Sequence, residues 1–248
     1  MKIAAISDIH GNLDALDAVL ADIARRGVDV IVNLGDIVSG HLQPRATAAR
    51  LMALGLPTIR GNHERQLLGD PARMGVSDAF ARGQLLPQQL AWIEALPARL
   101  RLREDVLLVH GTPASDLAYF LDSVTPQGSR AATPGEVAER AAGGAAAGAA
   151  LILCGHTHMP RSMPLPDGRL VVNPGSVGLQ AYGDDHGHAH VMENGTPHAR
   201  YAIAERGADG AWFAQFHAVA YDWEKAARLA LANGRPDWAV PLRTGRVA

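Results

Sequence analysis

The sequence predicts an α/β fold in which polar side chains gather beyond the carboxyl ends of the strands. Its main signal is a pattern that recurs six times, in which a short apolar run rich in β-branched residues stops at a polar motif containing Gly. Short apolar runs bounded by Gly and Pro are typical of buried strands. Amphipathic segments with helical periodicity separate several of the runs, and this alternation is typical of an α/β sheet.

The six predicted strands all end in such a motif. The strands cover residues 2–6, 28–34, 57–59, 106–109, 151–154 and 170–172. The motifs that follow them are, in chain order, DIHGN, GD, GNHE, HG, GHTH and NPGS. Ligands of α/β sheets bind beyond the carboxyl ends of the strands. We therefore expect residues that are far apart in the sequence to meet at one edge of the sheet.

Three helices are predicted between the strands. Residues 13–25 carry an apolar stripe, and Asn12 is placed to cap the first turn. Residues 44–54 carry a second stripe. A third helix is predicted to begin at Pro134, with Glu136 in the position of a capping box. Its helical pattern becomes weaker in the Ala- and Gly-rich stretch that follows.

The C-terminal part has a different pattern. It contains two stretches that alternate like antiparallel strands and two that read as closing helices, at residues 200–204, 212–220, 222–232 and 236–242. No linker, repeat or shift in composition divides the chain. We predict a single domain over residues 1–248, with the motifs in residues 1–180 and the C-terminal strands and helices in residues 181–248.

Composition and charge exclude several classes of protein. The net charge is −2, with 23 basic and 25 acidic residues, whereas nucleic-acid-binding proteins usually carry a basic stripe or domain. No stretch reaches the roughly 20 apolar residues of a membrane span, and Asp8 interrupts the N-terminus before a signal-peptide core could form. The single Cys154 excludes a disulfide framework. We predict a cytoplasmic protein that binds neither membranes nor nucleic acid.

The strand-end motifs contain a set of potential metal ligands. Carboxylate and amide oxygens mixed with imidazoles suit Mn, Fe, Co, Ni or Zn. The spacing of Asp8 and His10, repeated in His156 and His158, lets two side chains reach one side of a strand end. Seven candidates are too many for one tetrahedral ion, so we predict two divalent ions that share a carboxylate, with His63 left over. The seven are Asp8, His10, Asp36, Asn62, His110, His156 and His158.

The charge of such a centre favours a phosphate ester as substrate. Two divalent ions carry four positive charges, and Asp8, Asp36 and one bridging hydroxide together carry three negative charges. The site keeps one net positive charge, which attracts an anion. Two-metal sites also clamp the attacking and leaving oxygens of an in-line displacement and lower the pKa of bound water to about 7. A small phosphate ester is therefore the expected substrate.

The ordered set of six motifs resembles the calcineurin-like metallophosphoesterases, and it looks closest to their small bacterial members with phosphodiesterase-type activity. The resemblance spans about residues 2–180. It implies a four-layer sandwich of two mixed β-sheets flanked by helices. It also implies that His63 is the catalytic histidine, which contacts the phosphate and protonates the leaving oxygen.

The resemblance further implies how the ligands divide between two ions. One ion is expected on Asp8, His10, Asp36 and His158. The other is expected on Asp36, Asn62, His110 and His156, so that Asp36 bridges the pair. Manganese is the metal we favour, with Fe, Zn, Ni or Co as alternatives.

The sequence departs from its relatives at two places that bear on the substrate. Ser/Thr protein phosphatases follow the GD motif with Asp-Arg-Gly, whereas this chain has GDIVSGHLQPR at residues 35–45. Small relatives often follow NPGS with Pro-Arg, whereas VGLQAYGDD stands here, so a basic contact is missing. The candidates to replace that contact are Arg60, Arg65, His41 and Arg161. Asn173 is expected to orient a ligand histidine or a loop rather than bind metal.

We favour a phosphodiesterase over a phosphomonoesterase and keep two alternatives. One is a catalytically weak metal-binding scaffold, although the presence of His63 and all seven ligand candidates argues against it. The other is a Ser/Thr-type protein phosphatase. The tract of His186, His188 and His190 resembles a metal site, but its Gly and Asp neighbours favour a mobile surface loop.

Overall fold

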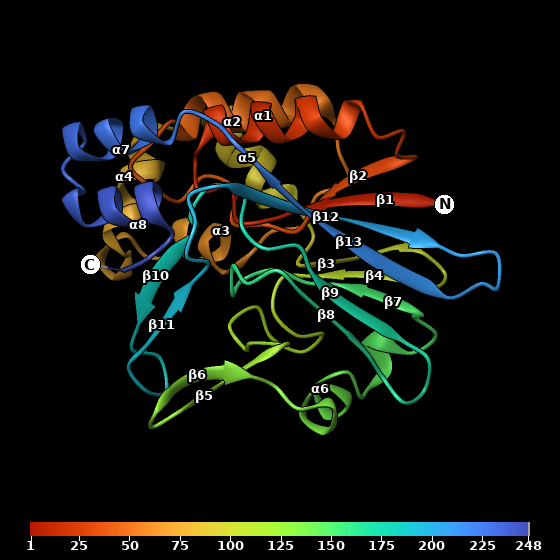
Figure 1. The fold of residues 1–248 in the computed structure, drawn as a ribbon. Coiled ribbons are helices and arrows are strands. Elements are labelled where there is room, and N and C mark those ends of the chain that lie inside the picture. Colours follow the sequence, from red (N-terminus) through yellow and green to blue (C-terminus); the bar gives the residue numbers. More distant parts are fainter. Residues whose placement is uncertain (248) are drawn as a thin grey trace.

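The computed structural model describes residues 1–247, and two mixed β-sheets packed face to face form its centre (Figure 1). The first sheet has the order β13-β12-β1-β2 and the second the order β3-β4-β7-β9-β8. The strands of the first sheet are β1 (Lys2–Ile6), β2 (Val30–Asn33), β12 (Ala199–Arg206) and β13 (Trp212–Val219). Those of the second sheet are β3 (Arg99–Arg103), β4 (Val106–Val109), β7 (Leu151–Leu153), β8 (Arg161–Pro164) and β9 (Leu170–Asn173).

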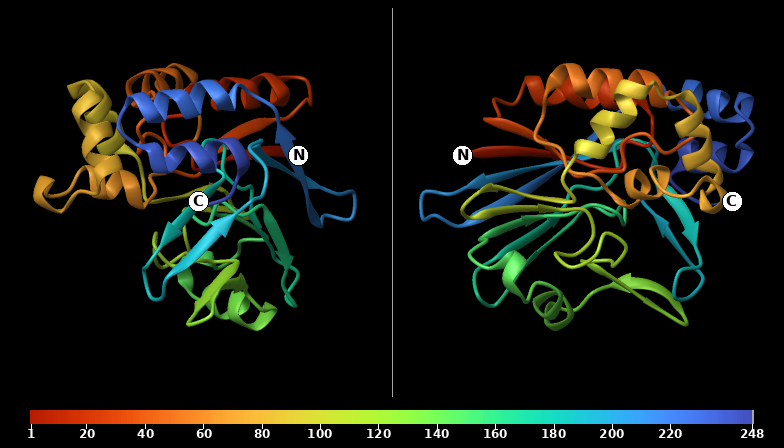
Figure 2. Two further views of the ribbon diagram at one scale, coloured as in Figure 1. Left: turned by 60° about the vertical axis from the view of Figure 1, so that its left-hand side comes forward. Right: turned by 180° about the vertical axis from the view of Figure 1, so that it is seen from behind.

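Helices flank both sheets and complete four layers (Figures 1 and 2). Helices α1 (Leu13–Ala24) and α2 (Pro44–Leu54) cover the first sheet, and α6 (Pro134–Arg140) covers the second. The other helices are α3 (Asn62–Leu67), α4 (Val76–Gln84), α5 (Pro87–Ala95), α7 (Trp223–Ala232) and α8 (Ala239–Thr244). Two hairpins lie outside the sheets: β5 (Asp122–Thr125) with β6 (Gly128–Ala131), and β10 (Ala181–Asp184) with β11 (His190–Glu193).

The apolar side chains of the central strands alternate between an inner and an outer core. In β1, Ile3 and Ala5 face the second sheet, whereas Ala4 and Ile6 pack against the helices of the outer layer. The side chains of β7 alternate in the same way: Leu151 and Leu153 lie in the core between the sheets, and Ile152 lies in the core on the α6 side. Successive side chains of a strand point to opposite faces, so strands buried on both faces must be apolar throughout. The predicted sandwich of two mixed sheets flanked by helices is thereby confirmed.

Local capping signals are also confirmed. The Asn12 side chain accepts a hydrogen bond from the Ala15 backbone N–H (3.2 Å) and so caps α1. Thr133 and Glu136 form the capping box of α6. The closing helix predicted at 236–242 is instead a 3₁₀ turn, Pro236–Trp238, followed by α8.

Several strands differ from the prediction, among them residues 57–59 and β3. Residues 57–59 form only a single bridge, Thr58 with Asn33, because the chain turns into α3 directly afterwards. Conversely, β3 was not predicted although its RLRLR sequence alternates. Its leucines pack on the inner core and its arginines are exposed, as the alternation requires.

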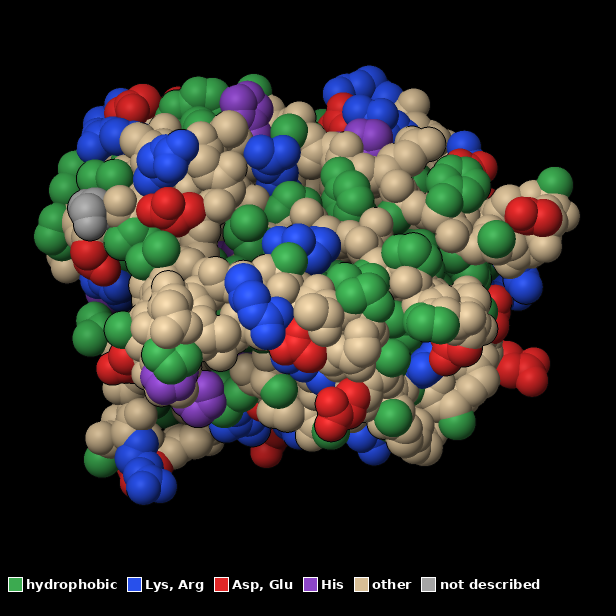
Figure 3. Space-filling view, turned by 60° about the horizontal axis from the view of Figure 1, so that its bottom comes forward, with side chains coloured by type: hydrophobic (Ala, Val, Ile, Leu, Met, Phe, Trp, Pro, Cys, Tyr) green, Lys and Arg blue, Asp and Glu red, His purple; other side chains and the backbone are tan. Residues whose placement is uncertain are grey.

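The outer surface mixes charges of both signs. Basic and acidic side chains are interspersed over the face drawn in Figure 3, which carries the β5–β6 and α6 layer. Within residues 1–247, no helix has the length and apolar character that crossing a membrane requires.

Candidate functional site

Five residues at strand ends adopt the left-handed backbone conformation. They are the only residues other than Gly with positive φ in the described part of the chain, and their φ angles lie between 51° and 71°. This conformation costs an L-residue roughly 1–2 kcal/mol and is therefore rare outside functional sites. All five are predicted metal ligands: Asp8, His10, Asp36, His156 and His158.

Glycines allow these strand ends to converge. A Cβ atom on Gly61 would overlap Asp36 Oδ1 and lie 2.8 Å from His110 Cε1. A Cβ atom on Gly155 would overlap Ser7 and lie 2.9 Å from Asp8 Oδ2. The GNHE and GHTH motifs therefore need Gly because a carboxylate from another strand end occupies the space of a side chain.

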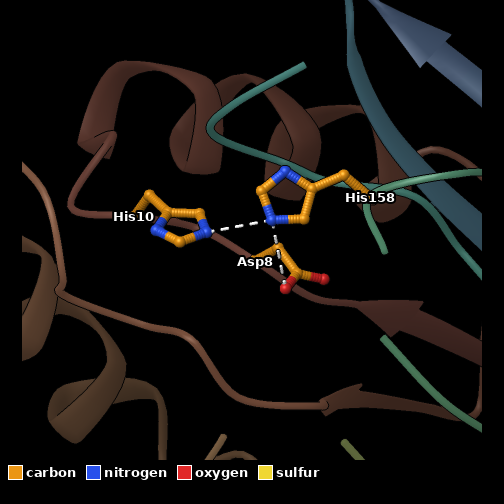
Figure 4. Close-up of side chains that lie close together, drawn as sticks. All are labelled: Asp8, His10 and His158. Atoms are coloured by element: carbon orange, nitrogen blue, oxygen red, sulfur yellow. Dashed lines mark hydrogen bonds and ion pairs between the residues drawn. The ribbon is translucent and has the colours of Figure 1, made fainter. Parts of the chain in front are cut away.

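The first group of ligand candidates consists of Asp8, His10 and His158 (Figure 4). His10 Nε2 lies 3.1 Å from His158 Nε2, which in turn lies 3.5 Å from Asp8 Oδ1. All three side chains are buried. Asp8 also accepts the backbone N–H of His156 (3.2 Å), which joins the first strand end to the GHTH loop.

The second group consists of Asp36, His110 and His156, with Asn62 beside it. His110 Nε2 lies 3.1 Å from Asp36 Oδ2 and 3.1 Å from Asn62 Oδ1. The rings of His110 and His156 are 5.1 Å apart between centroids. The structure thus brings together all seven residues that the sequence proposed as ligands, in two adjoining groups.

Backbone carbonyls fix which nitrogen each imidazole presents. His10, His110 and His158 donate their Nδ1–H to the carbonyls of Ser39, Leu34 and Leu179, at 2.8, 2.8 and 2.7 Å. Nε2 of each ring is therefore the nitrogen that would bind a metal ion. His156 has the opposite arrangement, because its Nε2 donates to the Leu117 carbonyl (3.0 Å) and leaves Nδ1 free. Such hydrogen bonds are how proteins orient metal-binding histidines.

This donor set fits a divalent cation. His10 Nε2 and His158 Nε2 lie 3.1 Å apart beside Asp8 Oδ1, so two imidazole nitrogens and a carboxylate oxygen converge within reach of a single ion. Ligands held about 2.0–2.2 Å from one ion lie about 3.0–3.4 Å apart. Burial lowers the pKa of His10 and of His156 to about 4, so both rings are neutral and able to bind a metal.

Metal binding should therefore stabilise the fold. At a hundredfold excess over Kd, bound Mn²⁺ adds about 2.7 kcal/mol to the free energy of unfolding. We therefore expect it to raise the melting temperature of metal-stripped protein by roughly 5–10 °C. Differential scanning fluorimetry would measure this. The rise should shrink in His158→Ala, which lacks a predicted ligand, and persist in His198→Ala, a partly exposed histidine packed on Trp223. Equal shifts in the two variants would contradict the assignment.

His63 stands beside the second group on the first turn of α3. Its backbone N–H donates to Asp36 Oδ1 (3.0 Å), and its Nδ1 lies 2.9 Å from Asp78 Oδ1 and 3.2 Å from Ser39 Oγ. Burial would lower the pKa of His63, but Asp36 and Asp78 raise it to about 9. With Nδ1 bonded to Asp78, Nε2 remains available at the cavity that His63 lines.

Two buried carboxylates that were not predicted from the sequence support the site. Asp78, on α4, holds His63 as described. Glu64 Oε2 accepts the backbone N–H groups of Asp36 (2.8 Å) and Gly61 (2.9 Å), and its Oε1 accepts that of Ile37 (2.7 Å). Glu64 thereby clamps the GD and GNHE loops together. Its place in the GNHE motif was a visible signal, whereas Asp78 belongs to no motif.

Three of the residues that were predicted to support the site or contact the substrate lie outside the two ligand groups. They are Asn173, His41 and Arg60. Asn173 Nδ2 donates to the Gly155 carbonyl (2.6 Å) and to Thr157 Oγ1 (3.0 Å), behind the GHTH loop. His41 stacks on Phe80, with ring centroids 4.2 Å apart. Within the described residues, neither His41 nor Arg60 lines the cavity at the ligand groups.

The histidine tract divides within the β10–β11 hairpin. His186 and His188 are exposed at its turn, whereas His190 is buried at the start of β11. His190 Nε2 contacts the Tyr119 hydroxyl at 2.9 Å. Neither group of potential ligands found in residues 1–247 includes any of the three.

Members of both ligand groups (His10 and His158, Asp36 and His156) line one cavity of about 880 Å³ together with His63. It extends from the strand ends to the β10–β11 hairpin and the segment before β5. Trp238, from the C-terminal 3₁₀ turn, forms another part of its wall, with its ring centroid 6.1 Å from that of His10. The site therefore draws on both the motif-bearing and the C-terminal parts of the chain.

Comparisons with known proteins agree with this geometry. The family model described as "Calcineurin-like phosphoesterase superfamily domain" matches residues 1–196. A metallophosphoesterase from Sphaerobacter thermophilus is 28% identical over 98% of each chain, and its crystal structure superposes with a TM-score of 0.73. An uncharacterized protein of Methanocaldococcus jannaschii is 26% identical over 95% of this chain and 94% of its own. The resemblance inferred from the six motifs is confirmed, and the chain belongs to the calcineurin-like phosphoesterase superfamily.

Proposed function

We propose that the protein is a metal-dependent phosphoric ester hydrolase that acts on a small substrate and prefers phosphodiesters to phosphomonoesters. The observation that carries this proposal is that members of two ligand groups, together with His63, line one cavity of about 880 Å³. Two divalent ions are expected, with manganese favoured over Fe, Zn, Ni or Co.

The residues divide into three roles. Asp8, His10 and His158 would hold one ion, and Asn62, His110 and His156 the other, with Asp36 shared. When bound, the two ions would polarise the phosphoryl group and supply hydroxide at neutral pH. Asp78 keeps Nδ1 of His63 engaged, so that Nε2 can contact a phosphate oxygen and give a proton to the leaving oxygen.

The alternatives fit the site less well. A scaffold without catalysis has no need for a protonated histidine held by a buried carboxylate next to a cation site. In place of the Asp-Arg-Gly element of the Ser/Thr protein phosphatases, Ser39 follows the GD loop and its carbonyl orients His10. A hydrolase of small esters therefore remains the best-supported function.

A paired assay tests the proposal. Metal-stripped protein reloaded with Mn²⁺ should hydrolyse bis-p-nitrophenyl phosphate with a higher kcat/KM than p-nitrophenyl phosphate. His63→Ala supplies the background rate, and His198→Ala should retain wild-type turnover. Preference for the monoester would overturn the diester assignment. Turnover no higher than that of His63→Ala, with each of Mn, Fe, Zn, Ni and Co, would instead favour the scaffold.

A further inference from the structure

The cavity extends well beyond the space that a phosphate group needs. Its volume of about 880 Å³ lies in the upper part of the range, roughly 300–1,000 Å³, of pockets that hold drug-sized ligands. The part of the wall that we call the outer wall begins at Tyr119 and Tyr182, whose rings pack on His156 and His158 (centroids 5.1 and 4.7 Å apart). It continues through His190 and the turn of the β10–β11 hairpin. If the protein hydrolyses phosphate esters as proposed, this outer wall faces the organic group of the ester.

The outer wall offers no free cation to a second phosphate. Arg140 is the only Lys or Arg that lines the cavity within the described chain. Its guanidinium is already committed, because Nη1 donates to the carbonyls of Phe120 (3.0 Å) and Asp122 (2.9 Å) and Nη2 to Ser123 Oγ (2.7 Å). Phosphate recognition needs such donors free. A ligand with a second phosphate would therefore be poorly bound here.

The charged groups that remain on this wall are acidic. Asp184 and Asp185 line the cavity at the end of β10 and just beyond it. Asp184 Oδ1 accepts only a backbone N–H, that of His186 (3.0 Å), so no cationic side chain neutralises it among the contacts of the described residues. These carboxylates repel anionic groups and attract cationic ones.

The aromatic part of the wall offers hydrogen-bond acceptors. His190 Nδ1 donates to the His188 carbonyl (2.7 Å), so its Nε2 accepts the hydroxyl proton of Tyr119 (2.9 Å). The Tyr182 hydroxyl lies 2.7 Å from the Tyr119 hydroxyl and 3.2 Å from the His156 carbonyl, so its single proton is shared between these two acceptors. Both hydroxyl protons are consumed within the protein, and lone pairs on the phenolic oxygens are left over.

We propose that this wall is a subsite for the organic group of the substrate, selecting a group that donates hydrogen bonds and carries no negative charge. Polyols and amino alcohols have this chemistry, since their hydroxyl or ammonium groups match the phenolic lone pairs and the carboxylates. Polyphosphates and oligonucleotides do not, because they would place a second phosphate beside Asp184 and Asp185.

A series of matched ligands tests the subsite separately from catalysis. The four monoesters ethyl, 2-hydroxyethyl, 2-aminoethyl and 2-carboxyethyl phosphate differ only in the distal group, and their Kd for Mn²⁺-loaded protein can be measured by calorimetry. We expect the hydroxyl and ammonium ligands to bind roughly tenfold more tightly than ethyl phosphate. The carboxylate ligand should bind more weakly than ethyl phosphate. Their p-nitrophenyl diesters should follow the same order in kcat/KM.

Variants assign the effect to the wall. Tyr182→Phe removes a phenolic acceptor and should reduce the preference for 2-aminoethyl over ethyl phosphate. Tyr221→Phe is the matched control, because its hydroxyl accepts a hydrogen bond from Asn12 (3.2 Å) outside the cavity, and it should keep the wild-type preference.

The possible outcomes separate the two proposals. Equal or tighter binding of 2-carboxyethyl phosphate, or identical preferences in the two tyrosine variants, would overturn the subsite. Turnover of the ethyl diester without any ranking would overturn the subsite and leave the hydrolase standing. The expected ranking in binding without turnover of any diester would support the subsite and count against the hydrolase.

Discussion

His63→Ala should lower kcat for the preferred ester by roughly 10²–10⁴-fold, the usual contribution of general acid catalysis. His63 is held by Asp78 at 2.9 Å and lies on α3 next to Asn62, at the cavity. Its side chain is not among the predicted metal ligands. The variant should therefore keep its metal content, and metal analysis separates a catalytic role from loss of the metal site.

Asp78→Asn provides a second, graded variant. Asparagine can still contact Nδ1 but loses the negative charge that favours protonated His63. We expect kcat to fall by less than in His63→Ala, with little change in KM. His198→Ala is the control for the loss of a histidine. Wild-type kcat in His63→Ala, with the metals still bound, would refute the assignment of His63 as the proton donor.

Glu64→Ala should lower the free energy of unfolding by roughly 3–5 kcal/mol, because it leaves buried donors without a partner. Glu64 is fully buried and its carboxylate accepts three backbone N–H groups, two of them from the GD loop that carries Asp36. Urea unfolding measures the loss. We also expect fewer ions per protein by metal analysis, since the Asp36 carboxylate loses its anchored loop.

Two further variants sharpen this test. Glu64→Gln keeps the volume but turns one oxygen into an N–H donor, so it should also be destabilising. Glu94→Ala, at an exposed position of α5, controls for the loss of a carboxylate and should change stability little. Equal stability of the Glu64 and Glu94 variants would show that the two loops need no clamp.

The layers and ligand candidates could be predicted because their signals are local. A buried strand must be apolar on both faces, and a left-handed turn with a close neighbour requires Gly, so each strand end has a recognisable sequence. The contact between His63 and Asp78 has no such signal, because it depends on how α3 packs against α4. The β5–β6 and β10–β11 hairpins escaped prediction because their strands, DSVT, GSRA, AYGD and HVME, are not apolar runs and are too short to show a clear alternation.

The role of the C-terminal part was likewise out of reach of sequence patterns. Its strands and helices were expected only to close the fold. Trp238 nevertheless lines the cavity, and Arg235 donates to Ser77 Oγ (2.6 Å), beside the Asp78 that holds His63. These contacts join residues more than a hundred positions apart, so only the folded chain brings them together.

The position of β12 between β13 and β1 also fixes the order in which a growing chain can complete its first sheet. Every predicted ligand, from Asp8 to His158, leaves the ribosome before β12 (Ala199–Arg206) is made. Until then, β1 has β2 on one side and an open edge on the other, where Ile3 and Ala5 later pair with Ala204 and Ala202. An unpaired edge of this kind recruits other strands. To cover that edge, the growing chain therefore depends on β12, which is made only after all the predicted ligands have been synthesised.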